Sequence, residues 1–138
     1  MSKPLRLICA AVFLFALAPP SGQADSFTDD MAEAAQGWIN AMGDKVNGGR
    51  FDFTDVERFD WHYTPKSRNG IVLSAMSEPQ RDALKKLMRT TMSSPGILKA
   101  QAIMALEGVL AEIEGSSLSY RDPEKYFVSV FGEPGQHP

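Results

Sequence analysis

The chain has 138 residues, with 14 basic and 17 acidic side chains and a formal net charge of −3 at neutral pH. This acidic balance excludes the basic surface field that nucleic-acid-binding proteins use, so we expect no nucleic-acid partner. The length fits one small domain or part of a larger one.

The first two dozen residues have the three parts of a cleavable export signal. Basic residues lie at the start, an uncharged apolar run covers residues 7–18, and small residues precede Asp25. This pattern predicts a signal peptide over residues 1–24, cleaved between Ala24 and Asp25, and a secreted or periplasmic mature chain. The apolar run spans only about 18 Å of helix against a hydrocarbon core of about 30 Å, so we expect no stable membrane anchor after cleavage.

Cleavage would remove Lys3, Arg6 and Cys9, which leaves a mature chain with 12 basic residues, 17 acidic residues and no cysteine. Such a chain has no disulfides and no thiol catalysis, so its stability must come from burial. The mature chain keeps two histidines, His62 and His137, and a metal site would depend mostly on carboxylates. We assign no metal ligand, and the sequence identifies no cofactor.

Apolar residues at helical spacing predict three helices. The first covers residues 27–43, and the second starts at Ser77, where Gln80 completes a capping box. The third opens with Ser94-Pro95 as cap and first-turn proline and runs to about Glu114. It is apolar almost all round, which is typical of a helix at the centre of a core.

Two segments alternate with the period of a strand. Residues 58–63 place three aromatic side chains on one face, and a basic, turn-rich loop follows over residues 65–70. Residues 125–131 form the second predicted strand. Helices with two short strands indicate an α+β fold, and since two such strands do not make a stable sheet alone, we expect an incomplete domain.

His62 is the most suggestive single residue. It lies two positions after Asp60, on the polar face of the first predicted strand, and a carboxylate at that spacing can orient an imidazole for acid–base work. The alternative is a half-buried histidine that bonds to its neighbours for packing reasons.

Glu107 is the second candidate, because it lies in the most apolar helix. Desolvation there would suit it to acid–base chemistry, or it forms a structural ion pair with Arg58 or Arg68. The loop with Lys66 and Arg68 could hold an anion or be a solvated turn. Residues 121–124 are most simply a turn with a local charge pair.

A series of short motifs, in order, resembles a bacterial exported family known as domain of unknown function 3500. The motifs are Trp61-His62-Tyr63-x-Pro65-x-x-Arg68-x-Gly70, Met76-Ser77-x-x-Gln80, Ile103-Met104-x-Leu106-Glu107-x-Val109-Leu110, Arg121-Asp122-Pro123-Glu124-x-Tyr126 and Phe131-Gly132-Glu133-Pro134. The resemblance covers roughly residues 30–134.

The resemblance implies positions rather than an activity. Members of that family are longer and continue into a stretch rich in tryptophan and histidine, so this chain corresponds to their amino-terminal half. The family has no established activity to carry over. His62, Arg68, Glu107 and Tyr126 stand at motif positions and are the site candidates, the first and third as catalytic residues and the others as binding residues.

Two functional hypotheses follow. The first is a hydrolase or a metal-dependent enzyme in the full-length protein, with this shorter chain inactive. The second is a non-enzymatic binding module of the cell envelope, which uses the aromatic segment and the Lys66–Arg68 loop to recognise a small molecule or an envelope ligand that the sequence does not identify.

Overall fold

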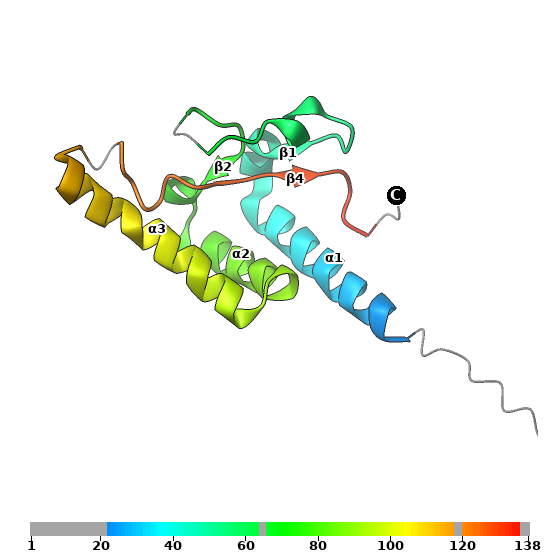
Figure 1. The fold of residues 1–138 in the computed structure, drawn as a ribbon. Coiled ribbons are helices and arrows are strands. Elements are labelled where there is room, and N and C mark those ends of the chain that lie inside the picture. Colours follow the sequence, from blue (N-terminus) through cyan, green and yellow to red (C-terminus); the bar gives the residue numbers. More distant parts are fainter. Residues whose placement is uncertain (1–21, 64–65, 118–119, 136–138) are drawn as a thin grey trace, which may run out of the picture.

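The structure, a computed structural model, describes residues 22–63, 66–117 and 120–135. Within them, three helices and four very short strands confirm the α+β prediction (Figure 1). The helices are α1 (Gly22–Met42), α2 (Glu78–Thr91) and α3 (Ser94–Glu114). The strands are β1 (Arg50–Phe51), β2 (Ile71–Val72), β3 (Phe127–Val128) and β4 (Val130–Phe131), and short 3-10 helices cover Gly43–Gly48, Val56–Phe59 and Leu73–Ala75.

The core lies where α1 packs against α2 and the start of β2. Trp38 is completely buried, and six other buried side chains surround it: Ile39, Met42, Val46, Ile71, Met76 and Leu84. The predicted stripe of α1 is therefore confirmed at its carboxyl end, although Phe27 at its start is 58% exposed. The helix begins at Gly22, five residues before the predicted start, and ends before Gly43, whose φ of +55° suits glycine.

One extended segment, residues 127–131, pairs with both other strands. β3 runs antiparallel to β2, and β4 runs parallel to β1. Figure 1 shows this segment passing over the helices beside β1 and β2. Backbone bonds continue the pairing on either side, from Val130 N–H to the Gly49 carbonyl at 2.8 Å and from Leu73 N–H to the Tyr126 carbonyl at 2.9 Å. The predicted strand over residues 125–131 is confirmed in position, but it is divided between two partners.

Two glycines allow this close pairing. A Cβ on Gly49 would lie 2.8 Å from the Val128 carbonyl oxygen, which is closer than real Cβ contacts come. A Cβ on Gly70 would lie 2.7 Å from the Ser129 hydroxyl, and Gly70 also has a φ of +109°. Side chains at either position would push residues 127–131 away from β1 and β2.

The predicted strand over residues 58–63 is wrong. Asp55 accepts a hydrogen bond from the Glu57 N–H at 2.8 Å and starts a 3-10 turn over Val56–Phe59, and no strand pairing follows in residues 60–63. Phe59 and Trp61 are each 77% exposed. Aromatic and polar residues do alternate in this segment. A stable strand, however, needs a partner strand or a core to pack against, and this segment contacts neither.

The helix starts at α2 and α3 follow local chemistry. The capping box is confirmed, since the Ser77 N–H donates to the Gln80 side chain at 3.0 Å. The cap of α3 is Ser93 rather than Ser94, and its side chain accepts from the Gly96 N–H at 3.3 Å.

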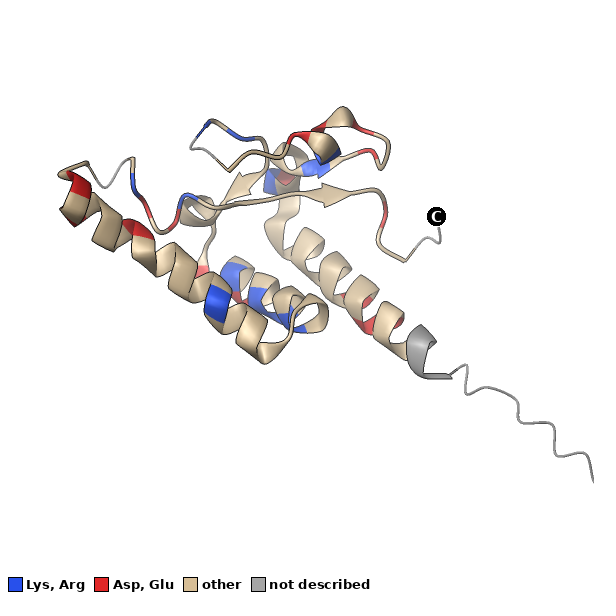
Figure 2. Cartoon of the chain, in the orientation of Figure 1, with Lys and Arg blue, Asp and Glu red and all other residues tan. Residues whose placement is uncertain are grey.

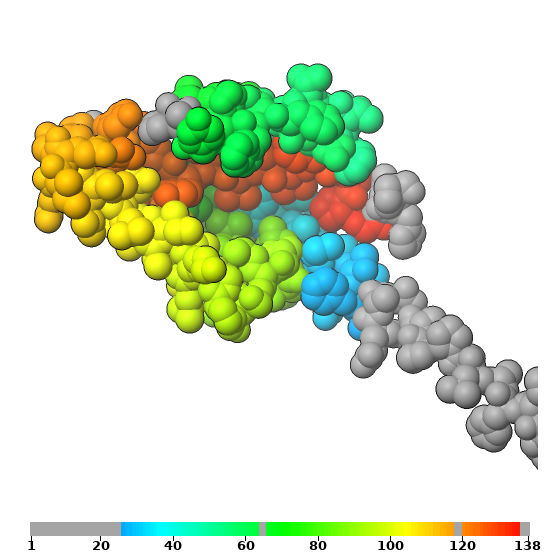
Figure 3. Space-filling view, in the orientation of Figure 1, coloured from blue at the N-terminus to red at the C-terminus, as the bar shows by residue number. Residues whose placement is uncertain are grey.

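The expectation that α3 is central in the core is wrong. Ala111 is its one buried residue, and its apolar side chains face solvent along much of its length. The more exposed ones are Leu98, Ile103, Leu106, Val109 and Ile113. Figure 3 shows α3 at the surface of the molecule, beside α2. An apolar sequence on all sides of a helix does not ensure that other elements pack on all its sides. In the described residues, other parts of the chain cover only one side of α3.

The predicted signal peptide lies almost entirely outside the described residues. In the part of the chain that is described, none of the helices combines the length and the apolar character that crossing a bilayer requires.

An ion pair ties α2 to the segment before β3. Arg81 donates to both carboxylate oxygens of Glu124, at 2.7 and 2.9 Å. The hydrogen bonds from Arg81 lower the pKa of Glu124, and the same contact raises the pKa of Arg81. This bidentate contact therefore holds the segment before β3 at a fixed distance from α2.

The two tryptophans give a test of where the core lies. Replacing Trp38 by alanine should lower the free energy of unfolding by about 3–5 kcal/mol, because it opens a cavity at the centre of the α1–α2 contact. Trp61→Ala, the same change at an exposed site, should alter it by less than about 0.5 kcal/mol. Urea unfolding followed by far-UV circular dichroism measures both, and equal effects would contradict this location of the core.

The Arg81–Glu124 pair predicts a pH dependence. Because the folded-state pKa of Glu124 lies below its ordinary 4.5, the pair stabilises the fold above that pH and loses its effect as the pH falls through the lowered value. Wild type should be more stable than Glu124→Gln at neutral pH, and the difference should shrink in acid. Glu33→Gln is the control. It removes an ion pair with Lys86 in which both side chains are exposed, so it should change the stability little at either pH.

Candidate functional site

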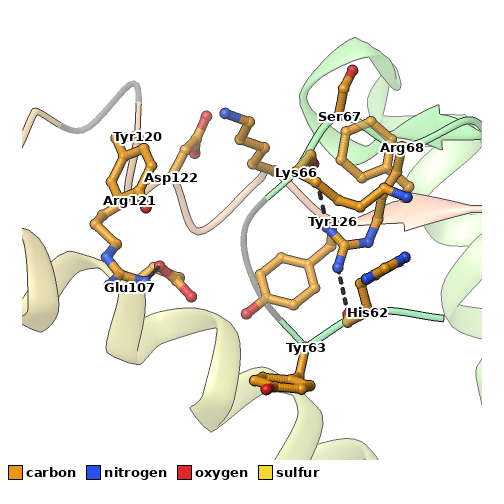
Figure 4. Close-up of a pocket in the computed structure, with 12 residues that line it drawn as sticks. His62, Tyr63, Lys66, Ser67, Arg68, Glu107, Tyr120, Arg121, Asp122 and Tyr126 are labelled. Atoms are coloured by element: carbon orange, nitrogen blue, oxygen red, sulfur yellow. Dashed lines mark hydrogen bonds and ion pairs between the residues drawn. The ribbon is translucent and has the colours of Figure 1, made fainter.

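Three parts of the chain surround a pocket of about 550 Å³, which we call the site pocket (Figure 4). They are the loop residues 62–63 and 66–68, the side of α3 at Glu107, and residues 120–122 and 125–127, which lead into β3. Every residue that the sequence analysis selected lines it: His62, Arg68, Glu107 and Tyr126. The fold therefore brings together four side chains that come from three separate segments.

Glu107 forms an ion pair, but with neither of the suggested arginines. Its carboxylate lies 3.5 Å from the guanidinium of Arg121, which also binds Glu114 at 2.7 and 2.8 Å. Arg58 instead donates to the Phe53 carbonyl. The hydrogen bonds to Glu114 come first among the causes that raise the pKa of Arg121, and they lower the pKa of Glu114.

This arrangement corrects the local interpretation of residues 121–124. Arg121 reaches back to α3, and Glu124 reaches α2, so the two charges connect layers of the fold rather than each other. Asp122 does form a local turn, since its side chain accepts from the Glu124 N–H at 2.8 Å.

Tyr126 completes the wall beside Glu107. It is partly buried, and burial is the first cause that raises the pKa of its phenol above the ordinary 10. The negative charge of the neighbouring Glu107 acts in the same direction. At neutral pH Tyr126 is therefore a hydrogen-bond donor, and Figure 4 shows its ring standing between Glu107 and the loop residues.

His62 contacts Asp60 as its spacing suggested, although the backbone there is not a strand. The imidazole Nε2 lies 3.1 Å from a carboxylate oxygen of Asp60, and Lys66 binds the same carboxylate at 2.7 and 2.9 Å. The hydrogen bond from Lys66 is the first cause that lowers the pKa of Asp60. Figure 4 shows the imidazole turned away from Glu107.

Arg68 stabilises the loop through hydrogen bonds to the loop's own backbone carbonyls. Its guanidinium donates to the His62 carbonyl at 2.5 Å and to the Lys66 carbonyl at 3.3 Å. The loop and the segment from Arg121 to Lys125 carry basic residues at the same end of the molecule (Figure 2).

Several lining residues were not among the candidates predicted from the sequence, including Tyr120, Arg121 and Lys125. Their signal was present, because a run of charged and aromatic residues stands directly before a predicted strand. The placement of Arg121 against α3 depends on contacts between distant segments, which no local pattern contains.

In the described residues, no three or more His, Cys, Asp or Glu side chains gather in a way that could hold a metal ion. The two carboxylates of the site pocket contact Arg121, in the case of Glu107, and the Glu124 N–H, in the case of Asp122.

The Tyr126–Glu107 contact predicts a shifted titration. In an absorbance titration of tyrosinate, Tyr126→Phe should remove a component that ionises above pH 10, because the carboxylate of Glu107 disfavours a second negative charge. Glu107→Gln should lower that pKa, and burial should keep it above the ordinary value. Glu112→Gln, which removes a carboxylate of α3 that does not line the pocket, should leave it in place. If Tyr126→Phe keeps the component that ionises above pH 10, the proposed effect of Glu107 on Tyr126 is wrong.

Comparison with known proteins gives one result. A family model described as "Protein of unknown function (DUF3500)" matches residues 24–138. No curated protein and no solved structure matches the chain.

Proposed function

The chain belongs to the DUF3500 family, and we propose that it binds a small anionic molecule in the site pocket. The observation that carries this proposal is the charge of the pocket wall. Four basic side chains line it against two acidic ones, and two carboxylates just outside the lining, Asp60 and Glu114, bind Lys66 and Arg121. The basic ones are Lys66, Arg68, Arg121 and Lys125, and the acidic ones are Glu107 and Asp122.

The basic lining of the pocket contrasts with the acidic composition of the whole chain. The whole sequence has a net charge of −3, whereas basic side chains outnumber acidic ones among the residues that line the pocket. Basic groups that converge on a cavity attract an anion, and arginine adds directional hydrogen bonds to a carboxylate or phosphate.

The size and lining of the pocket also suit a small molecule. A volume of about 550 Å³ falls within the range of ligand-binding sites. Three tyrosines add flat apolar surface with a hydroxyl at the edge: Tyr63, Tyr120 and Tyr126. Such side chains bind the apolar and polar parts of one ligand together.

The arrangement favours binding over the hydrolase hypothesis. That hypothesis uses His62 and Glu107 together, but the imidazole binds Asp60 and the carboxylate binds Arg121 and Tyr126. A candidate acid–base pair has to reach the same reacting atom. A binding role requires only that the groups face a common ligand.

The predicted export signal agrees with this proposal, because it would place the pocket outside the cytoplasm, where envelope ligands are found. We therefore propose a secreted or periplasmic binding module rather than a cytoplasmic one.

Gluconate and sorbitol test the proposal, since they have the same carbon skeleton length and differ in charge. Gluconate should shift amide signals of the pocket segments in an NMR titration, and sorbitol should not. Lys125→Gln should weaken gluconate binding about two- to fivefold, because one partly screened charge is lost. Lys99→Gln removes a charge from α3 outside the pocket and should have no effect.

Two results would contradict the proposal. One is equal binding of sorbitol and gluconate. The other is an equal effect of Lys125→Gln and Lys99→Gln, which would indicate attraction to the general surface of the protein rather than to the pocket.

A further inference from the structure

The segment between β1 and β2 displays aromatic side chains that the fold does not use for packing. Trp61 is 77% exposed and Tyr63 is 87% exposed, although each carries a large apolar surface. Exposed aromatic surface that contributes nothing to a core is typical of a binding surface.

These two rings form a pair at the rim of the site pocket. Their centroids are 6.2 Å apart and their planes are inclined by 49°. Tyr63 also lines the pocket, so the aromatic pair continues into its wall. Because the rings are tilted rather than stacked flat, the pair leaves ring faces open to solvent.

The backbone that carries the pair is held in place by polar contacts. The Trp61 N–H donates to the Phe59 carbonyl at 2.8 Å. Asp60, which lies between Phe59 and Trp61, is bound by Lys66 and His62. A backbone held in this way loses less freedom when a ligand binds to the rings that it carries.

We propose that the site pocket takes an acidic saccharide, whose pyranose ring stacks on Trp61 and Tyr63 while its carboxylate faces the basic wall of the pocket. This inference rests on the proposed anion-binding function and adds the class of ligand. A pyranose ring has an apolar face of C–H bonds with partial positive charge, and an aromatic face is negative. Its hydroxyls require polar neighbours at the ring edge.

The surroundings of the pair meet that requirement. The imidazole of His62 is about half exposed between the two aromatic residues in the sequence, and Asp60 adds acceptor oxygens. The basic wall lies on the pocket side of Tyr63. Aromatic faces, hydrogen-bonding groups and positive charge thus occur in one continuous surface.

A lipid surface is the less favoured partner. Insertion of Trp61 into a bilayer would bring the charged pair of Asp60 and Lys66 into the interface beside it. A saccharide can contact the rings and these polar groups at the same time.

Methyl β-D-glucuronide and gluconate test the inference, because both carry one carboxylate but only the first has a closed ring. Wild type should bind the glucuronide about three- to tenfold more tightly, the ratio that an aromatic contact supplies. Trp61→Ala should bring that ratio close to one and leave gluconate affinity unchanged. Phe59→Ala is the matched control, because Phe59 is equally exposed but it is Trp61 that forms the ring pair with Tyr63, and this variant should keep the ratio.

The outcomes separate the two proposals. If neither anion binds, the proposed function fails and the saccharide inference fails with it. If both bind equally, or if Trp61→Ala keeps the ratio, the pocket binds anions but the stacking inference is wrong. Binding to phosphatidylglycerol vesicles that depends on Trp61, without a preference for the closed ring, would overturn it in favour of a membrane surface.

Discussion

The close passage of residues 127–131 between β1 and β2 is the constraint on which the rest of the structure depends. Neither β1 nor β2 pairs with the other, so both obtain their strand partner from this segment. Gly49 and Gly70 make the passage possible, because a side chain at either would collide with Val128 or Ser129. The same segment continues backward into the wall of the site pocket, and its position therefore sets the position of Tyr126.

Two arginines connect the chain just before residues 127–131 to the helices. Arg81 holds the segment from α2 through Glu124, and Arg121 holds it against α3 through Glu107 and Glu114. Arg121 and Glu107 line the site pocket, and Glu124 stands in the sequence between the lining residues Asp122 and Lys125. The geometry of the pocket is consequently set by long-range ionic hydrogen bonds more than by apolar packing, since the buried core lies on the other side, between α1 and α2.

The sequence predicted the features whose causes are local. The capping box at Ser77 and the apolar stripe of α1 are determined by neighbouring residues. Strands of two residues have no period to detect, so β1 and β2 were missed, and the alternation over residues 58–63 described exposed aromatics instead of a strand. The site candidates came from residue type and motif position. Their convergence, and Arg121 as the partner of Glu107, follow from contacts between segments far apart in the chain.

The order of the strands along the chain has a consequence for synthesis on the ribosome. β1 and β2 emerge early, while residues 127–131, which supply their hydrogen bonds, emerge after all three helices. The α1–α2 pair can form first, because its residues are made before the partner strand exists. Until then the edges of β1 and β2 carry unpaired backbone groups. Translation therefore exposes the nascent chain to mispairing for as long as α3 is being made.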